Sequence, residues 1–228
     1  MTRYHALLLG IFAAVWVWAA IAPRYPHDWL LENYLVFVFV PVIVLTARYF
    51  RLSNLSYTLI TAFMLLHVVG SHYTYAEVPF GTTLQHWFGS GRNMYDRLVH
   101  FAYGLLLAYP IREVLMRIAR LRGFWSYFFP IDITFSFSSI YEIIEWKAAA
   151  LAAPELGMAF LGTQGDIWDA QKDMLLAGTG AVIAMVIVFL LNLWLNPNTL
   201  TEMRDSFRLP KEDRPLGEVK IEEWLEKD

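Results

Sequence analysis

Long apolar blocks alternate with short polar connections along most of the chain. The blocks lie near residues 5–22, 32–49, 54–75, 95–116, 124–150 and 172–195. Each is close to the roughly 20 residues that a helix needs to cross the hydrocarbon core of a bilayer. The pattern predicts an all-α, polytopic membrane protein whose six transmembrane helices form one bundle.

The composition agrees with this prediction and narrows the chemistry. Hydrophobic residues make up 57% of the 228 residues and charged residues 17%, against about 45–50% and about 25% in soluble domains. The chain has no cysteine, which excludes disulfides, thiolate nucleophiles and cysteine-based zinc sites. The expected partner is the lipid bilayer, and no nucleic-acid partner is expected.

The basic residues predict the orientation of the spans. Most of the 18 Lys and Arg residues fall in the N-terminus, the second and fourth connections and the segment after Asn196. Because cytoplasmic loops carry excess Lys and Arg, both termini are predicted to face the cytoplasm. Residues 1–196 then form the six-span transmembrane domain and residues 197–228 a charged cytoplasmic tail. The tail either is solvated or ends in an amphipathic surface helix over EVKIEEWLEKD.

Several ionisable side chains fall inside the predicted spans, where they are costly and usually mark function. The third span ends with two of them, His67 and His72, in the stretch FMLLHVVGSHYTYAEVP. Either histidine could instead bond a neighbouring backbone carbonyl.

The fourth span begins with Asp96 and His100, which are four residues apart and therefore share one helix face. A carboxylate one turn from an imidazole can orient it, raise its basicity or share a metal with it. The neighbouring Arg97 is predicted to point elsewhere. The alternative is a helix-start acid favoured by the helix dipole, together with a structurally bonded histidine.

The fifth span carries acidic and hydroxyl side chains at helical spacing. They form two overlapping stripes, Asp132–Ser136–Ser139–Glu142 and Ser138–Glu142–Glu145. Carboxylates on helices are the usual way in which bundles hold metals or protons. A structural hydrogen-bond seam is the alternative.

Three aspartates, Asp166, Asp169 and Asp173, lie at the start of the sixth span. Their spacing places them on one helix face if the helix begins by Gly165, although Asp166 could also be its N-cap. Further along, Gly178 and Gly180 permit close contact with another helix.

The predicted topology brings these groups to one side of the membrane. Odd-numbered spans run outward and even-numbered spans run back. The end of span three therefore meets the start of span four, and the end of span five meets the start of span six. Every histidine and acid above except Asp132 then lies toward the outer face. We predict one shared outward-facing pocket, covered by the connection from Tyr75 to Tyr95.

Four of these stretches together resemble the YjdF-type family of bacterial inner-membrane proteins. They are HVVGSHYTYAEVP, NMYDRLVHFAYGLLLAYPIRE, SSIYEIIEW and FLGTQGDIWDAQKDMLLAGTGA. The resemblance extends over about residues 5–195. It implies a multi-pass helical protein of the bacterial inner (plasma) membrane and no particular activity.

The chain is also similar, more distantly, to VanZ-like proteins, which are linked to glycopeptide resistance. Their pattern is an acidic-basic pair and a histidine on one helix, a glutamate on the next, and a twin-aspartate helix with a small-residue end. The matching residues here are Asp96, Arg97 and His100, then Glu142 or Glu145, then Asp169 and Asp173 with the GTGA stretch.

The favoured hypothesis is a metal-dependent membrane hydrolase or transferase that acts on a lipid or lipid-linked envelope molecule. A divalent metal, most simply zinc, would be bound by histidines and carboxylates. The candidate ligands are His67, His72, His100, Asp166, Asp169 and Asp173. The candidate catalytic groups are Glu142, Glu145 and Asp96, with one glutamate as general base.

Two other functions stay open at this point. Intramembrane acids and histidines also serve proton-coupled transporters, in which Asp132 would extend the path inward. Against a transporter, the sequence has no inverted repeat. The third hypothesis is a non-catalytic membrane scaffold in which the polar seam serves packing.

Overall fold

The computed structural model describes residues 2–151, 163–208 and 223–226, and the regular elements among these residues are all helices, with no strand. The elements are α1 (Arg3–Ala20), α2 (Pro26–Thr46), α3 (Asn54–Tyr73), the short 3-10 helix η1 (Tyr75–Glu77), α4 (Pro79–Phe88), α5 (Tyr95–Arg117), α6 (Trp125–Leu151), α8 (Asp169–Leu195) and α9 (Thr199–Asp205). The all-α prediction is therefore confirmed.

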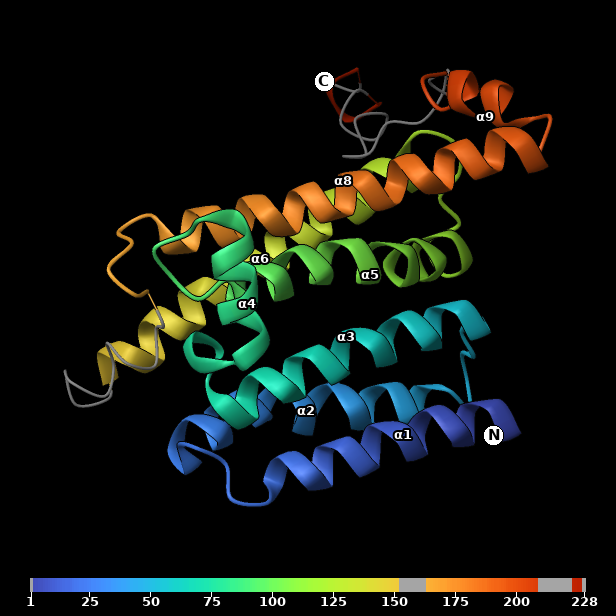
Figure 1. The fold of residues 1–228 in the computed structure, drawn as a ribbon. Coiled ribbons are helices and arrows are strands. Elements are labelled where there is room, and N and C mark those ends of the chain that lie inside the picture. The colour runs from blue at the N-terminus through green and yellow to red at the C-terminus, as the bar shows by residue number, and fades with distance from the viewer. Residues whose placement is uncertain (1, 152–162, 209–222, 227–228) are drawn as a thin grey trace.

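The long helices match the predicted apolar blocks closely. Five of them, α1, α2, α3, α5 and α8, are long and apolar enough to cross a membrane. The remaining long helix, α6, has 27 residues, which makes it about 40 Å long at 1.5 Å per residue and hence able to span. The start of α1 and the short α9 lie at the same end of the bundle, opposite α4 (Figure 1). This arrangement is compatible with six crossings, and the predicted N-in, C-in orientation stays a prediction.

One boundary differs clearly from the prediction. The helix α2 begins at Pro26, earlier than the expected residue 32, because proline is well suited to the first helical position. The extension places Glu32 and Asn33 inside the helix, where both are buried.

The helix α5 lies at the centre of the bundle and packs on α3, α6 and α8, while α1 packs on α3. The contact between α5 and α8 is unusually close because glycines lie on both sides of it. A Cβ atom on Gly104 would clash with the carbonyl oxygen of Ala177, and one on Gly180 would clash with the carbonyl oxygen of Phe101. Small residues allow membrane helices to approach in this way, so the predicted packing role of Gly180 is confirmed.

The outer surface of the bundle is strongly apolar. Many large side chains on α8, such as Val186, Leu190 and Trp194, are exposed. An exposed apolar surface of this extent is expected where lipid, rather than water, surrounds the protein.

The connection between α3 and α5 folds into η1 and α4 and covers one end of the bundle (Figure 1). The helix α4 ends at Gly89, which adopts the left-handed conformation and donates its N–H to the last carbonyls, the usual role of a glycine at this position. The residues after it return to the bundle, where Arg92 and Asn93 are buried.

Part of the predicted cytoplasmic tail packs against the bundle. The Oγ of Ser206, just after α9, accepts a hydrogen bond from the backbone N–H of Phe124 at 2.9 Å. The indole of Trp125 donates to the carbonyl of Ser206 at 3.0 Å. The tail's first residues are therefore ordered on the connection between α5 and α6. The helix predicted over EVKIEEWLEKD lies mostly outside the described residues.

Candidate functional site

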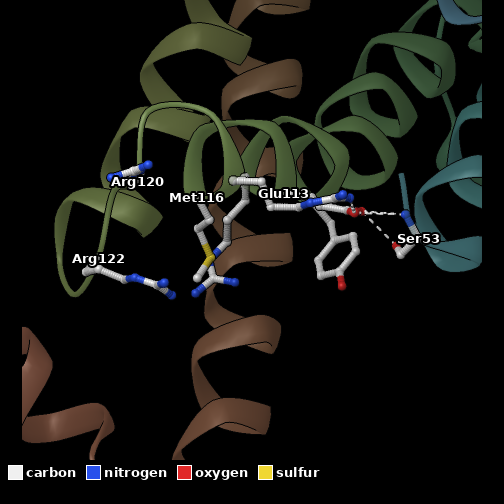
Figure 2. Close-up of a pocket in the computed structure, with 8 residues that line it drawn as sticks. Ser53, Glu113, Met116, Arg120 and Arg122 are labelled. Atoms are coloured by element: carbon white, nitrogen blue, oxygen red, sulfur yellow. Dashed lines mark hydrogen bonds and ion pairs between the residues drawn. The ribbon is translucent and has the colours of Figure 1, made fainter. Parts of the chain in front are cut away.

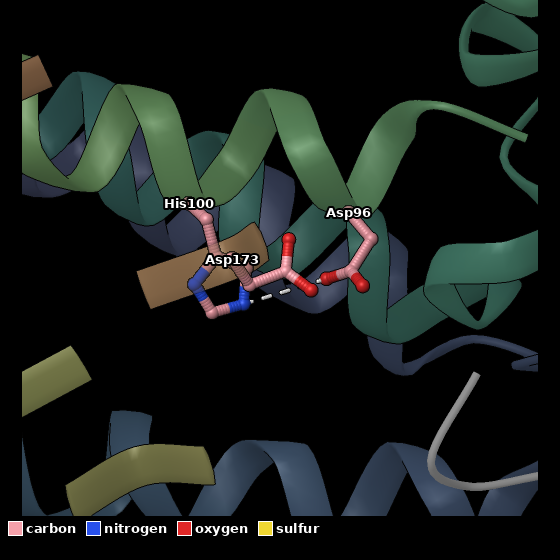
Figure 3. A group of neighbouring side chains, drawn as sticks. All are labelled: Asp96, His100 and Asp173. Atoms are coloured by element: carbon pink, nitrogen blue, oxygen red, sulfur yellow. Dashed lines mark ion pairs between the residues drawn. The ribbon is translucent and has the colours of Figure 1, made fainter. Parts of the chain in front are cut away.

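Three side chains from two helices form a compact polar cluster in the interior. Asp96 and His100 come from α5 and Asp173 from α8, and one potential ligand atom of each lies within 4.8 Å of the others. Figure 3 shows both carboxylates beside the imidazole ring. The Nε2 of His100 lies 3.6 Å from Oδ1 of Asp96. We call Asp96, His100 and Asp173 the central cluster.

A third helix adds a carboxylate to the central cluster. The Oε1 of Glu142, on α6, lies 3.4 Å from Nε2 of His100. Glu142 Oε1 and Asp173 Oδ1 are both buried, and neither has a hydrogen-bond partner among the described residues. A buried carboxylate oxygen that makes no hydrogen bond is costly, and each of these two atoms can accept a further bond.

The guanidinium of Arg97 binds the acids at the start of α8. Its Nη1 lies 2.5 Å from Oδ2 of Asp173, and its Nη2 lies 2.6 Å from Asp169 and 3.1 Å from Asp166. The prediction that Arg97 points elsewhere was wrong. Its long side chain reaches α8 because the glycine contact brings α5 and α8 unusually close.

Arg92 strengthens the same network from the connection before α5. It binds Asp169, and its Nη2 lies 3.7 Å from Asp96. Sequence reasoning did not select Arg92 as a site residue. The available signal was an arginine placed directly before a membrane span that opens with an acid, in the stretch GRNMYD.

Asp166 lies in the turn before α8, because the helix begins at Asp169 rather than by Gly165. Its carboxylate accepts hydrogen bonds from Lys172 at 2.7 Å and from the backbone N–H of Trp168 at 3.1 Å. Both contacts lower the pKa of the Asp166 carboxyl. Asp166 and Asp169 are thus bound by basic side chains, and the structure does not place them in the central cluster.

The two histidines of α3 also lie outside the central cluster. The Nδ1 of His67 lies 2.6 Å from the Tyr75 hydroxyl, and its Nε2 lies 3.2 Å from the carbonyl of Glu32. The ring of His72 packs on Trp18, with Nδ1 3.0 Å from the carbonyl of Ala19.

Helix geometry explains why these histidines do not share a site. Five residues of an α-helix rotate the side-chain direction by about 140°, so His67 and His72 face different neighbours. For both, the alternative of a backbone-bonded histidine describes the observed contacts.

A buried acid that the sequence did not reveal lies close to α6. Glu32 accepts a hydrogen bond from the Tyr141 hydroxyl at 3.0 Å and is only 8% exposed. Glu145, one turn after Tyr141, lines the cavity described next. The missed signal was the acid in LLENYLV, which stands inside α2 once that helix begins at Pro26.

An apolar cavity of about 590 Å³ extends from the central cluster along the bundle. Its walls come from α2, α3, α5 and α6, and its polar end holds His67, Tyr75, Asp96, His100, Tyr141 and Glu145. On α5 the lining extends from Asp96 to Leu115, which is about 29 Å at 1.5 Å per residue. That length is close to the full thickness of a bilayer's hydrocarbon core.

The polar stripe of α6 faces the interior through Ser138, Glu142 and Glu145. Ser138 is buried and lines the cavity, whereas Asp132 and Ser136 are exposed. Of the two predicted stripes, only the one that begins at Ser138 therefore faces the interior.

The fold and its apolar outer surface define a polytopic helical membrane protein with a buried polar cluster. The chain belongs to the family described as "Predicted membrane protein (DUF2238)", which matches residues 4–193. It is 42% identical to "Inner membrane protein YjdF" of Escherichia coli (strain K12) over 166 residues, or 71% of this chain and 79% of that protein. No solved structure matches it significantly.

The resemblance to the YjdF-type family is thereby confirmed, and the chain is a multi-pass protein of the bacterial inner membrane. The similarity to VanZ-like proteins stays a prediction.

Proposed function

We propose that this protein is a metal-dependent enzyme that acts on a lipid or lipid-linked molecule at the membrane boundary. The observation that carries the proposal is the central cluster of Asp96, His100 and Asp173, of which Asp96 and His100 line the polar end of an apolar cavity. The cluster would hold the reacting head group, and the cavity would hold the chain.

The charges around the central cluster support a bound cation. Five carboxyl groups meet three arginine or lysine side chains and His100; because a metal-binding imidazole is neutral, two acidic groups are in excess. The acids are Asp96, Glu142, Asp166, Asp169 and Asp173, and the bases are Arg92, Arg97 and Lys172. A divalent cation would balance this excess and would give the buried Oδ1 of Asp173, which has no hydrogen bond to a described residue, a partner.

The ligand atoms that the central cluster offers indicate which metal would bind. Zinc was expected because three histidines were candidate ligands, but the central cluster contains one imidazole and is otherwise made of carboxylates. Imidazole suits zinc, and carboxylates also suit manganese and magnesium. We therefore propose a divalent cation bound by Asp96, His100 and Asp173, with zinc and manganese as the ions to test first.

Each residue then has a distinct role. A divalent cation bound there would supply Lewis-acid polarisation of a phosphoryl or carbonyl oxygen. Glu142 lies next to His100 and is placed to accept a proton from the attacking group. Arg97 positions Asp173 by holding its second oxygen. Glu145, further along α6 at the cavity wall, would contact the substrate near its head group.

The length and shape of the apolar cavity favour a substrate with one long chain. Three of its lining residues on α6, Phe137, Ile140 and Ile144, are exposed, so the cavity is open along α6 and a lipid could enter it sideways from the bilayer. The length of about 29 Å exceeds the half-thickness of the hydrocarbon core. A single chain longer than one leaflet, such as a polyprenyl chain, fits this shape better than a two-chain phospholipid.

Two observations favour an enzyme over the other hypotheses. A proton path for a transporter was expected to include Asp132, but that side chain is exposed on α6 and is absent from the cavity lining. A scaffold seam would be expected to satisfy its own polar groups, whereas Glu142 and Asp173 each retain a buried oxygen that makes no hydrogen bond to a described residue.

Incubation of the purified protein with an envelope lipid extract and Zn²⁺ or Mn²⁺, followed by mass spectrometry of the lipids, tests the proposal. We expect one lipid class to be converted by the wild-type protein and by His72→Ala, whose ring lies outside the cluster. His100→Ala should leave that class unchanged. Equal conversion by His100→Ala, or no conversion with any divalent metal, would reject an enzyme built on this cluster.

A further inference from the structure

A second cavity lies toward the opposite end of α5 from the central cluster. It has a volume of about 760 Å³ and is lined by Arg112, Arg117, Arg120 and Arg122 together with Glu113 and Met116 (Figure 2). Four arginines and one glutamate give this cavity a strong positive charge. Arg112 is twelve residues beyond His100, or about 18 Å along the helix, so the two sites are separate.

Arg112 is the most informative residue in this cavity. It is only 8% exposed, and within the described ranges no carboxylate oxygen lies within 4.0 Å of it. One of its nitrogens donates to Ser126 at 3.3 Å, and its guanidinium carbon lies 4.4 Å from the Tyr127 ring centroid. Its Nε is buried and has no hydrogen-bond partner in the described part of the chain.

The remaining arginines of this cavity differ in whether a carboxylate already pairs with them. Arg117 is bound to Glu113 at 2.7 Å and covers the ring of Phe50. Arg120 and Arg122 are at the cavity rim, on the connection between α5 and α6, and Arg122 extends toward Met116 in Figure 2. Among the described residues, the arginine charge of this cavity that no carboxylate pairs with is therefore concentrated on Arg112, Arg120 and Arg122.

Topology alone does not account for this arrangement. Arginines are common in cytoplasmic connections of membrane proteins, where they normally face water. A buried guanidinium without a carboxylate is costly, and nothing in membrane orientation requires it. An anion that enters the cavity would relieve that cost and would bind the two rim arginines as well.

We propose that this cavity binds the phosphate group of an anionic phospholipid. Guanidinium groups bind phosphate through paired, charge-assisted hydrogen bonds. The cavity lies at the end of a membrane-spanning helix, where phospholipid head groups lie, and basic pockets between transmembrane helices are known to bind such head groups. The proposal is independent of the function of the central cluster.

Native mass spectrometry of the full-length protein with added phosphatidylglycerol tests this site. We expect Arg112→Gln to weaken binding about tenfold or more, since it removes charge-assisted hydrogen bonds to the phosphate. The double variant R120Q/R122Q changes only exposed rim residues and should also weaken binding, even if Arg112→Gln fails to fold. The control is Arg48→Gln, which removes an exposed arginine outside the cavity and should leave the affinity unchanged.

Inorganic phosphate, added in a parallel experiment, distinguishes a lipid phosphate group from free phosphate as the ligand. The proposal is supported if phosphatidylglycerol binds in an arginine-dependent manner and millimolar phosphate does not displace it. It is overturned if Arg48→Gln weakens binding as much as R120Q/R122Q, because that result indicates general charge attraction. A phospholipid site is also overturned if the binding of free phosphate depends on these arginines and the binding of phosphatidylglycerol does not.

Discussion

The Nη1 atom of Arg97 lies 2.5 Å from Oδ2 of Asp173, across the contact between α5 and α8. The other terminal nitrogen of the same guanidinium lies 2.6 Å from Asp169, one turn earlier on α8. A single side chain therefore fixes the register of the two helices that form the central cluster. It also occupies one oxygen of Asp173 and leaves the other without a partner among the described residues.

Replacing Arg97 should destabilise the protein strongly. Arg97→Met leaves Asp169 and Asp173 buried without this partner, and breaking a buried ion pair costs about 3–5 kcal/mol. Arg97→Lys should recover little of this loss, because an ammonium cannot bind two carboxylates with the fork geometry of a guanidinium. Thermal unfolding of the solubilised protein measures both effects.

Lys172→Gln is the matched control for Arg97. It also removes a basic partner of an acid that Arg97 binds, Asp166, but Lys172 is 53% exposed, and exposed ion pairs contribute about 0–1 kcal/mol. An unfolding temperature lowered as much by Lys172→Gln as by Arg97→Met would contradict the role assigned to Arg97.

The close contact of α5 with α8 predicts a specific sensitivity at Gly104. A Cβ atom there would lie 1.8 Å from the carbonyl oxygen of Ala177, so Gly104→Ala must push the helices apart. Overpacking of this kind costs about 1–3 kcal/mol or more. We also expect weaker metal binding, because Asp173 would move away from His100.

Gly10 provides the comparison for Gly104 within another span. A Cβ atom on Gly10 meets no atom within 4 Å, and alanine is the better helix former by about 1 kcal/mol. Gly10→Ala should therefore be neutral or slightly stabilising in the same unfolding measurement. Equal destabilisation by the two variants would show that the close contact between α5 and α8 is not the reason why Gly104 must be a glycine.

Filling the apolar cavity should separate lipid binding from metal binding. Ile111 lines the cavity far from the central cluster, and Ile111→Trp adds a bulky ring where the chain would lie. We expect lipid conversion to be lost while metal content is unchanged. Leu190→Trp adds the same ring on an exposed surface of α8 and should retain conversion; loss of conversion in both variants would count against the cavity as the substrate site.

The spans could be predicted from the sequence because bilayer thickness fixes the length of each apolar block, and that length can be counted along the chain. The pairing of Asp96 with His100 was also predictable, since it depends only on spacing within one helix. The convergence of Glu142 and Asp173 on His100 followed from the alternating direction of successive spans. These parts of the site required no knowledge of side-chain packing.

The rest of the site depends on how the helices rotate and how closely they approach. Spacing alone does not tell which neighbour a side chain faces, and His72 turned out to face α1 rather than the centre. Arg92 and Arg97 reach the acids because of the glycine contact, which sets an interhelical distance that no local pattern reveals. Glu32 was missed because the start of α2 was placed too late.

The most direct test of the account is the binding of a divalent metal to the purified, chelator-treated protein. Titration with Zn²⁺ and Mn²⁺, followed by elemental analysis, should give about one tightly bound ion per chain for the wild type, and the affinity should be coupled to deprotonation of the ligands. His100→Ala and Asp173→Asn should each lose that ion, whereas His72→Ala should retain it. A wild-type protein that binds neither metal, or equal binding by His100→Ala and His72→Ala, would contradict a metal centre at Asp96, His100 and Asp173.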